Sequence, residues 1–490
     1  MGVIQKQGIQ NAVITYIGIA IGFVSLLYIQ PKFLAKEELG LIRVLFSFSA
    51  LAATIFPLGM PSITFRYFPL FKNKEHGHHG YFSLMLLWPL VGYFICAAIL
   101  FALRSFIISQ YLEQSKLFTV YFNHVFALIF LIGFIGIVNT YSSALFKTIV
   151  PSVVSEIIVR IVYIATILIY ANGLVSLEGF LILFTGTYAL QFFLVLIYIF
   201  IIDRPALKFN LDFLKMQAPA KIIGYGLVLS FSGLANLGLK SIDIIILGKY
   251  VALSKVGIYA LAAFIPTVID APYYSLDKIT SPKIGEAWAR NDVSVIKEVY
   301  YKSTRYLMLA GGLIFLGIIL NVSTLFTLIP NDYSEGLNVV YIISIGTLIN
   351  ISTGVNDAIV FTSAKFNYGT YMLLLLLVLA VFNNLFFIPR FGIEGAAIAT
   401  ALSAFIYNLM KYLYIWKKFH MQPFDGNTLR ILLIIALTWL TFHWFPAIDN
   451  AIISIIFRSV LITVFYVGLA VLFKVAPELH SWLPWKMWKK

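Results

Sequence analysis

Polar and ionisable side chains recur at helical spacing inside segments that are otherwise apolar. Ser232, Asn236, Lys240 and Asp243 are separated by four, four and three positions, which places them on one face of a helix. Lys240 and Asp243 are also close enough along that face to form an ion pair. Because a charge at membrane depth is costly, it usually faces a bundle interior or a water-filled cavity. This face therefore predicts the lining of a polar cavity.

Four further apolar segments carry polar residues in the same way. They contain Thr267, Asp270, Tyr274 and Asp277; Asn350, Thr353 and Asp357; Arg43, Ser47 and Thr54; and Glu156 with Arg160. The alternative interpretation is that such groups pair with one another and hold helices together. For Glu156 and Arg160, one turn apart, both interpretations stand. Arg458, in a peripheral apolar helix, is interpreted as an anchor whose long side chain reaches a lipid headgroup.

The composition predicts that these segments span a membrane. Hydrophobic residues make up 61% of the chain and charged residues only 11%, against about 25% charged in an ordinary soluble domain. A spanning helix needs about 20 mostly apolar residues, whereas barrel strands would alternate in polarity. We therefore expect an all-α polytopic membrane protein. Its fourteen transmembrane helices are predicted at residues 9–30, 41–66, 81–104, 118–145, 152–171, 179–202, 222–247, 256–276, 306–329, 337–361, 368–388, 394–416, 429–448 and 452–473.

The formal net charge of +14 follows the expected topology. With the N-terminus inside, the inner segments hold 23 of the 35 Lys and Arg residues and the outer loops hold 7. Positive residues gather on the cytoplasmic side of membrane proteins, so both termini are expected in the cytoplasm. Part of the excess is expected to touch anionic lipid headgroups. Topology accounts for most of the charge, and nucleic-acid binding is not expected.

Two similar stretches lie 217 positions apart, KFLAKEELGLI at 32–42 and KYVALSKVGIY at 249–259. Val138-Asn139 matches Val355-Asn356 at the same offset. The matches predict an internal duplication of six helices, hence two lobes in the same orientation, as in transporters with parallel repeats. The expected domains are an N-terminal lobe at 1–202, a cytoplasmic linker at 203–221, a C-terminal lobe at 222–418, and helices 13–14 with a cytoplasmic tail at 419–490.

No catalytic or cofactor-binding motif stands out in the sequence. There is no G-x-x-x-x-G-K-[ST] phosphate loop, nucleophile elbow or zinc motif. His76, His78 and His79 form an H-G-H-H cluster, but its only nearby acidic partner is Glu75. We therefore expect no enzyme activity, no cofactor and no bound metal.

The predicted helices, the duplicated turns PKFLAKEELGLI and GKYVALSKVGIY, and the phrase FIPRFGIEGAAIATALS at 387–403 together resemble a known group. It is the multidrug/oligosaccharidyl-lipid/polysaccharide (MOP) exporter superfamily, specifically its polysaccharide-biosynthesis branch of Wzx-like flippases. The resemblance covers the whole chain. It implies an inner-membrane protein that moves a polyprenyl-diphosphate-linked oligosaccharide from the cytoplasmic to the periplasmic leaflet by alternating access, for cell-surface polysaccharide synthesis.

The resemblance leaves other functions open. Lipid II flippases of the same superfamily also have fourteen helices, and cation-coupled multidrug exporters typically have twelve. A membrane polysaccharide polymerase or ligase would need a sizeable outer loop for its acceptor, and the outer loops predicted here are short.

A lipid-linked headgroup of this kind needs a polar path, because its charges and hydroxyls would lose their hydration in hydrocarbon. The residues expected to contact the substrate are Arg43, Arg66, Asn236, Lys240, Lys283 and Tyr274. The four cationic residues are candidates for the diphosphate. The candidates for coupling to H+ or Na+ are Asp243, Asp270 and Asp357. Glycosyltransferases or a polymerase of the same pathway are the expected protein partners.

The predicted topology can be tested with an impermeant thiol reagent added to whole cells. On a Cys96→Ser background, Glu75→Cys and Ala289→Cys should both resist labelling, because both positions are expected on the cytoplasmic side. Labelling at either position would show that the N-inside topology is wrong.

Overall fold

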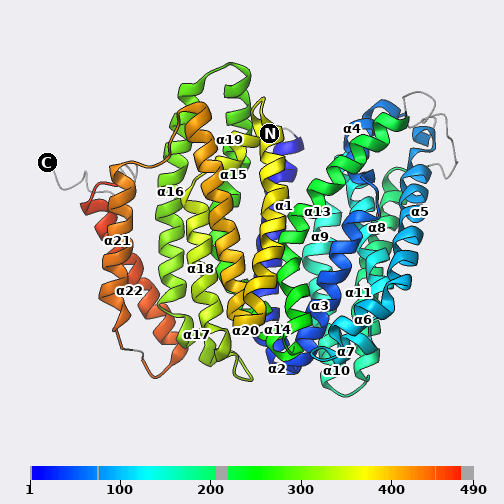
Figure 1. Cartoon of the computed structure of the whole chain (residues 1–490), viewed down its shortest axis with the longest axis horizontal. Helices are drawn as coiled ribbons and strands as arrows, with labels where there is room; N and C mark the ends of the chain where they lie inside the picture. The colour runs from blue at the N-terminus through cyan, green and yellow to red at the C-terminus, as the bar shows by residue number, and fades with distance from the viewer. Residues whose placement is uncertain (1–2, 74–76, 206–218, 447, 476–490) are drawn as a thin grey trace. The chain divides into compact units, whose positions relative to one another are not determined.

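Helices account for all the regular structure in the computed structural model, which describes residues 3–73, 77–205, 219–446 and 448–475 (Figure 1). No strand occurs among those residues. Twelve of the described helical stretches are long and apolar enough to cross a membrane, so the chain is a multi-pass membrane protein. It divides into two compact units, Met1–Gly257 and Ile258–Lys490.

The first unit begins with α1, which passes directly into a short π-helical turn, η1, and continues as a series of helices. Its elements are α1 (Val3–Val24), η1 (Ser25–Ile29), α2 (Gln30–Phe33), α3 (Lys36–Ile55), α4 (Met60–Phe71), η2 (Gly77–Gly80), α5 (Tyr81–Ala102), α6 (Arg104–Tyr111), α7 (Lys116–Val120), α8 (His124–Ala144), α9 (Ile149–Val153), η3 (Val154–Ile158), α10 (Val159–Ala171), α11 (Leu177–Ile202) and α13 (Pro219–Tyr250).

The second unit takes up the chain inside α14. Its elements are α14 (Leu253–Phe264), η4 (Ile265–Asp270), α15 (Ala271–Ala289), α16 (Val293–Ile319), α17 (Val322–Leu328), η5 (Ser334–Gly336), α18 (Leu337–Ser352), α19 (Asn356–Thr362), α20 (Phe366–Phe419), α21 (Gly426–His443) and α22 (Ala451–Leu472).

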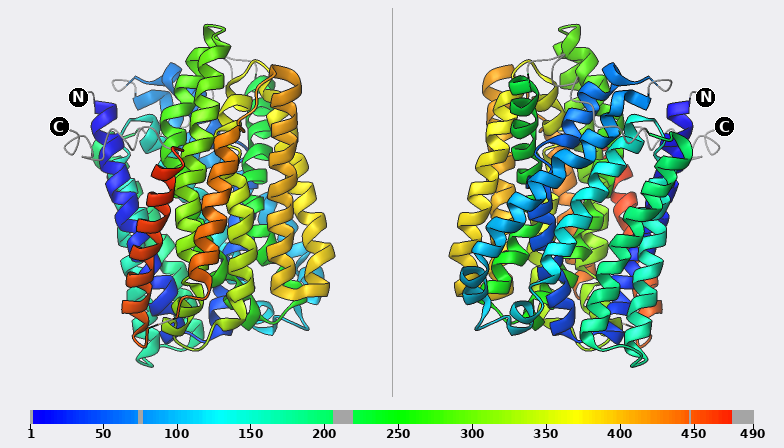
Figure 2. Two further views of the ribbon diagram at one scale, coloured as in Figure 1. Left: turned by 90° about the vertical axis from the view of Figure 1, so that its left-hand side faces the viewer. Right: turned by 90° about the vertical axis from the view of Figure 1, so that its right-hand side faces the viewer.

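The twelve candidate spans among the described residues follow the predicted helices, and two differences explain why fewer than fourteen are counted. The predicted helices 368–388 and 394–416 both fall within α20, whose backbone leaves helical values at Gly392 (φ 57, ψ −129). The chain reverses direction there, as Figure 2 shows for the yellow and gold helices. The predicted helix 222–247 falls within α13, part of whose side chains lie outside the described residues. The total of fourteen stays a prediction.

Two helices that the sequence predicts as continuous are broken. The predicted helix 41–66 ends as α3 at Ile55 and resumes as α4 at Met60, with Gly59 at a φ of 77 between them. The predicted helix 337–361 ends as α18 at Ser352 and resumes as α19 at Asn356. Pro57 removes a backbone donor at the first break, and glycine allows the left-handed backbone at both.

The division into units differs from the predicted lobes. It falls at Gly257, inside α14, rather than within 203–221, because α13 packs against α3 and α4 of the first unit. Residues 206–218 of the predicted linker lie outside the described part of the chain. The lobes rest on the sequence repeat rather than on packing, so their boundaries stay a prediction.

The last two helices pack on α16. Ile431, Ile434 and Ile462 are buried in one cluster with residues of α16. The Tyr466 hydroxyl donates a hydrogen bond of 3.1 Å to the carbonyl oxygen of Leu309. These contacts fix α21 and α22 to the second unit through apolar packing and a polar bond on the same face of α16.

The interpretation of Arg458 as a lipid-headgroup anchor is wrong. Its residue is only 7% exposed, and Nη2 donates 3.1 Å to the carbonyl oxygen of Phe442, in the last turn of α21. A cation at the C-terminal end of a helix is favourable, because the helix dipole is negative there. The residue therefore joins α22 to α21.

Packing against α16 predicts a stability difference between two of its glycines. A Cβ at Gly312 would lie 2.7 Å from Ile435 Cδ1 and 2.9 Å from the Tyr466 hydroxyl, whereas a Cβ at Gly317 would meet no atom within 4 Å. Gly312→Val should lower the free energy of unfolding by about 1–3 kcal/mol through overpacking. Gly317→Val, the matched control, should change it by less than about 0.5 kcal/mol. Thermal unfolding in detergent measures both, and equal effects would contradict the packing described here.

Candidate functional site

In the second unit, the break between α18 and α19 determines where Asp357 lies. Gly354 has a φ of 66, and a Cβ there would lie 2.2 Å from Thr304 Oγ1, so only glycine fits the turn. The break makes Asn356 the first residue of α19 and places Asp357 in its first turn. A carboxylate in that position is stabilised by the positive end of the helix dipole.

Asp357 is the acceptor of three side chains from two other elements. Lys411 Nζ lies 2.9 Å from Asp357 Oδ1, and the Tyr407 hydroxyl donates 3.2 Å to the same oxygen. The Tyr273 hydroxyl donates 3.3 Å to Oδ2. Two of these donors come from α20 and one from α15, so the carboxylate joins three elements of the unit.

The two partners of the ion pair differ sharply in exposure. The side chain of Lys411 is 1% exposed and that of Asp357 is 34% exposed. Lys411 Nζ also lies 4.0 Å from the centre of the Tyr407 ring, within range of a cation–π contact. A buried cation thus depends on a carboxylate that is about a third exposed.

A second polar cluster fixes the geometry of the break. Asn408 Nδ2 donates 2.7 Å to Asn350 Oδ1. Its Oδ1 accepts 3.1 Å from the Thr353 hydroxyl and 3.2 Å from Asn356 Nδ2. Asn408 and Asn356 are both 1% exposed. The side-chain amide of Asn408 on α20 therefore binds residues on both sides of the helix break. These bonds fix where α19 begins and so fix the position of Asp357.

The other predicted residues of the second unit lie along η4 and α15. Asp270 ends η4, and Tyr274, 56% exposed, follows one turn later. Asp277, in the next turn, accepts 2.6 Å from the Ser281 hydroxyl and interacts electrostatically with Tyr273. Lys283 is exposed on α15. The Tyr273 hydroxyl thus lies near two carboxylates, Asp357 and Asp277, whereas Lys283 lies farther along α15.

In the first unit, Arg43 on α3 is held by a buried amide. Arg43 Nη2 donates 3.2 Å to Gln30 Oε1. Gln30 is 4% exposed, and its Nε2 donates 3.1 Å to the Ser25 hydroxyl. The Nε of Arg43 is buried and has no hydrogen-bond partner among the described residues. A guanidinium has five donors, so this cation is positioned while part of its bonding capacity stays unused.

The Glu156–Arg160 pair forms, as one of the two interpretations expected. Arg160 Nη2 lies 2.8 Å from Glu156 Oε2, and both side chains are about a third exposed, at 34% and 29%. Two glycines of α1 make room for the pair. A Cβ at Gly22 would lie 1.9 Å from Arg160 Nη1, and one at Gly18 would lie 2.7 Å from Glu156 Oε2. The pair therefore joins η3 and α10 to α1.

The remaining predicted residues of the first unit are less defined. Arg66 is exposed on α4, and its guanidinium lies 5.5 Å from the centre of the Tyr67 ring. Asp243 on α13 accepts 2.9 Å from the backbone N–H of Ile244. The side chains of Asn236 and Lys240 lie outside the described residues. The predicted polar face of α13 therefore stays a prediction.

Sequence reasoning missed Lys411, Tyr407 and Gln30 as partners of the predicted residues. Tyr407 and Lys411 are four positions apart, hence on one helical face, and Lys411 is one of the few cations inside a predicted helix. That spacing was a usable signal. Nothing in the sequence pairs Gln30 with Arg43, because the contact forms across the turn between α2 and α3.

No protein-family model matches the sequence, and no curated protein matches it either. Solved structures do match. The structure "Lipid II flippase MurJ, inward closed conformation" is 13% identical with a TM-score of 0.73, and the match covers 96% of this chain and 99% of that one. An inward-facing MATE-family multidrug resistance transporter of the MOP superfamily is 13% identical with a TM-score of 0.61, over 83% of this chain and 96% of that one.

A third match is a MOP superfamily transporter from Pyrococcus furiosus, 15% identical with a TM-score of 0.51 over 83% of this chain and 94% of that one. At such identities the likeness shows the fold. The chain is therefore a multi-pass helical membrane protein with the fold of the MOP transporters. Among the solved structures named here, it fits the lipid II flippase with the highest TM-score, and the polysaccharide branch stays a prediction.

The Asp357–Lys411 pair predicts an asymmetric stability effect. Asp357→Leu should lower the free energy of unfolding by about 3 kcal/mol, because it leaves Lys411 buried without its carboxylate. Adding Lys411→Met should restore most of that loss, since a neutral pair of similar volume needs no desolvation. Thermal unfolding in detergent is the measurement. The control is Glu298→Gln, whose partner Lys302 lies 2.6 Å away in a pair that is 49% and 59% exposed; it should change little.

Proposed function

We propose that the protein is a flippase that moves a polyprenyl-diphosphate-linked oligosaccharide from the cytoplasmic to the periplasmic leaflet of the inner membrane by alternating access. The observation that carries the proposal is the extent of the fold match. The match to the lipid II flippase covers 96% of this chain, whereas the matches to the MATE and Pyrococcus furiosus transporters cover 83%. The added length shared with a lipid-handling protein favours lipid-linked cargo.

The cation in the first unit suits such a cargo. A diphosphate leaving water needs charged donors to replace its hydration, and guanidinium groups bind phosphate oxygens with two parallel hydrogen bonds. Arg43 supplies a guanidinium that Gln30 orients. In this proposal Arg43 contacts the diphosphate, and Arg66, Lys240 and Lys283 are further candidates. Asn236 and Tyr274 are the candidates for the sugar hydroxyls.

The pair in the second unit suits ion coupling. Binding of H+ or Na+ to Asp357 would neutralise the carboxylate on which Lys411 depends, so the energy of the pair would change with the bound ion. The hydroxyls of Tyr273 and Tyr407 donate hydrogen bonds to the same carboxylate. Their oxygen atoms are of the kind that coordinates a small cation. In this proposal Asp357 is the coupling residue, and Asp243 and Asp270 remain candidates.

A lipid II flippase is the second candidate function, because the first-named matching structure is one. Both candidates share a polyprenyl diphosphate and differ in the sugar. A cation-coupled multidrug exporter is less favoured, since a cationic drug is repelled by residues such as Arg43. The proposed setting includes cytoplasmic N- and C-termini and contacts with glycosyltransferases or a polymerase of the same pathway.

The contact between Arg43 and the diphosphate can be tested by flipping in proteoliposomes. The cargo is a fluorescent polyprenyl-diphosphate oligosaccharide, and an impermeant quencher reports which leaflet holds it. Arg43→Gln should slow flipping by about 10-fold or more, because a hydrogen bond to a charged group is lost. Arg43→Lys should keep part of the rate, since lysine binds phosphate with a different geometry. Arg390→Gln, at an exposed arginine of α20, is the control and should not change it.

The same assay tests the predicted face of α13. If Lys240 contacts the cargo, Lys240→Gln should slow flipping at normal protein levels, and adding Asp243→Asn should not restore it. Full flipping by the double variant would leave Lys240 as a partner of Asp243 and remove it from the site.

Lipid II and a cationic dye in parallel liposomes separate the three functions, since each predicts a different preferred cargo.

A further inference from the structure

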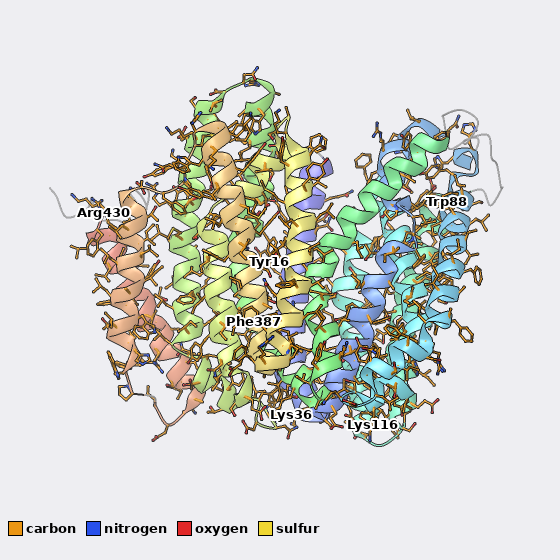
Figure 3. The ribbon with its side chains drawn as sticks, viewed as in Figure 1. Tyr16, Lys36, Trp88, Lys116, Phe387 and Arg430 are labelled. Carbon is orange, nitrogen blue, oxygen red and sulfur yellow. The ribbon has the colours of Figure 1, made fainter. Side chains whose placement is uncertain are left out.

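One face of α3 joins the Arg43 site to a cavity at the helix break. Arg43, Phe46, Ala50 and Ala53 are separated by three, four and three positions, which places them on one helical face. Lys36, at the start of α3, lies at the lower end of the first unit in the view of Figure 3. The face therefore leads from that end past Arg43 toward the break. The distance from Arg43 to Ala50 along the helix axis is about 10 Å.

The cavity has a volume of about 250 Å³ and lies where α3 gives way to α4. Small residues of α3, α4 and α8 line it, among them Ala50, Thr54, Ser62, Gly133 and Gly136. None of the described lining residues is charged. All of them belong to the first unit, as Arg43 does.

The helix break also leaves a backbone oxygen at this cavity. Pro57 has no N–H, so it cannot bond to the carbonyl oxygen of Ala53, as the residue four positions later does in a regular helix. That oxygen lies 3.3 Å from the position that a Cβ would take on Gly133, which lines the cavity. The Thr54 hydroxyl donates 3.0 Å to the carbonyl oxygen of Ala50 and keeps its own oxygen as an acceptor. The cavity thus combines apolar surface with a few polar atoms, as ligand pockets do.

Two tyrosines lie beside Arg43 at the near end of the same face. The Tyr188 ring stacks on Phe46 with ring centres 5.8 Å apart, and Phe184 packs against Tyr188 at 5.4 Å and against Tyr163 at 5.5 Å. Both hydroxyls interact electrostatically with Arg43, and both tyrosines are partly exposed. Neither hydroxyl has a hydrogen-bond partner among the described residues. Two uncharged hydrogen-bonding groups are therefore available to a ligand next to the cation.

We propose that the cavity and the two tyrosines form a subsite for the first sugar of the lipid-linked cargo, so that the protein distinguishes a glycosylated polyprenyl diphosphate from the bare one. The inference rests on the proposed function, in which Arg43 contacts the diphosphate. A diphosphate at Arg43 places its attached sugar between the two tyrosines and Ala50, because all of these groups lie along one face of α3.

A sugar ring matches the chemistry of this surface better than the other parts of the cargo do. Its C–H faces pack on aromatic rings and small apolar side chains, and its hydroxyls replace the hydrogen bonds that they lose on leaving water. A further anionic group would need a cation, which the described lining of the cavity lacks. A polyprenyl tail would leave the tyrosine hydroxyls and the Ala53 carbonyl oxygen without partners, which is costly away from water.

The first test narrows the cavity and compares two ligands. Native mass spectrometry of the purified full-length protein in detergent measures the binding of a short-chain polyprenyl diphosphate that carries one hexose, and of the same lipid without the sugar. Gly136→Leu should weaken binding of the glycosylated lipid about tenfold, which corresponds to 1.4 kcal/mol, and leave binding of the bare lipid unchanged. A Cβ at Gly136 meets no atom within 4 Å, so the change fills space without forcing the helices apart.

Gly186→Leu on α11 is the matched control for the cavity. A Cβ at Gly186 also meets no atom within 4 Å, and this residue does not line the cavity. The control should bind both lipids with the parental affinity.

The second test removes the two hydroxyls and keeps the rings. Tyr163→Phe with Tyr188→Phe should weaken binding of the glycosylated lipid about tenfold and leave the bare lipid unchanged, because only the sugar uses these groups. Tyr198→Phe, at another partly exposed tyrosine of α11, is the control and should bind both lipids as the parent does. Arg43→Gln should weaken binding of both lipids, since both carry the diphosphate.

The outcomes separate this inference from the proposed function. A parental protein that binds both lipids equally well would overturn the sugar subsite and leave the proposed function standing. Equal weakening of both lipids by Gly136→Leu would assign the cavity to the diphosphate or the tail. Parental affinity for the glycosylated lipid in Gly136→Leu or in the double tyrosine variant would remove the cavity or the tyrosines from the site. A parental protein that binds neither lipid would refute the proposed function, and this inference with it.

Discussion

The rest of this structure depends on a constraint of the hydrocarbon phase. No water is present there to bond a free backbone N–H or carbonyl group, so a spanning segment must satisfy its backbone internally. A helix can stop inside the membrane only where neighbouring groups take over those bonds. The breaks at Gly59 and Gly354, inside helices predicted to span the membrane, are two such places among the described residues, and each depends on a glycine with a positive φ. The second of them is the origin of the candidate ion site.

The same constraint governs the side chains. A lysine as deeply buried as Lys411 is stable only beside a counter-charge, and Asp357 provides it. The carboxylate reaches Lys411 because α19 begins one residue before it, and α19 begins there because Asn408 bonds to both ends of the broken helix. Backbone geometry, an amide network and an ion pair are therefore successive steps of one arrangement. Removing any step would expose the next to hydrocarbon or leave a charge unpaired.

The two units divide their polar chemistry differently. The first holds a guanidinium that a buried amide orients, which in the proposed function binds an anionic headgroup. The second holds a carboxylate bound by three donors of the protein, which in the proposed function loses its charge when it binds H+ or Na+. A transporter that couples ion movement to cargo movement needs both kinds of site.

The sequence by itself determined the class of protein, the approximate position of most helices and several residues of the sites. These follow from local properties, since length, hydropathy and helical spacing do not depend on distant parts of the chain. It also identified the repeated turns that contain Gly40 and Gly257. Only the tertiary structure decided what the site residues touch. Lys411 lies 54 positions from Asp357. Along the chain, Arg458 has apolar neighbours, as a headgroup anchor would have. Its side chain nevertheless bonds to the end of α21. Contacts of that kind depend on how helices cross, which is set by the packing of many side chains at once rather than by any local pattern.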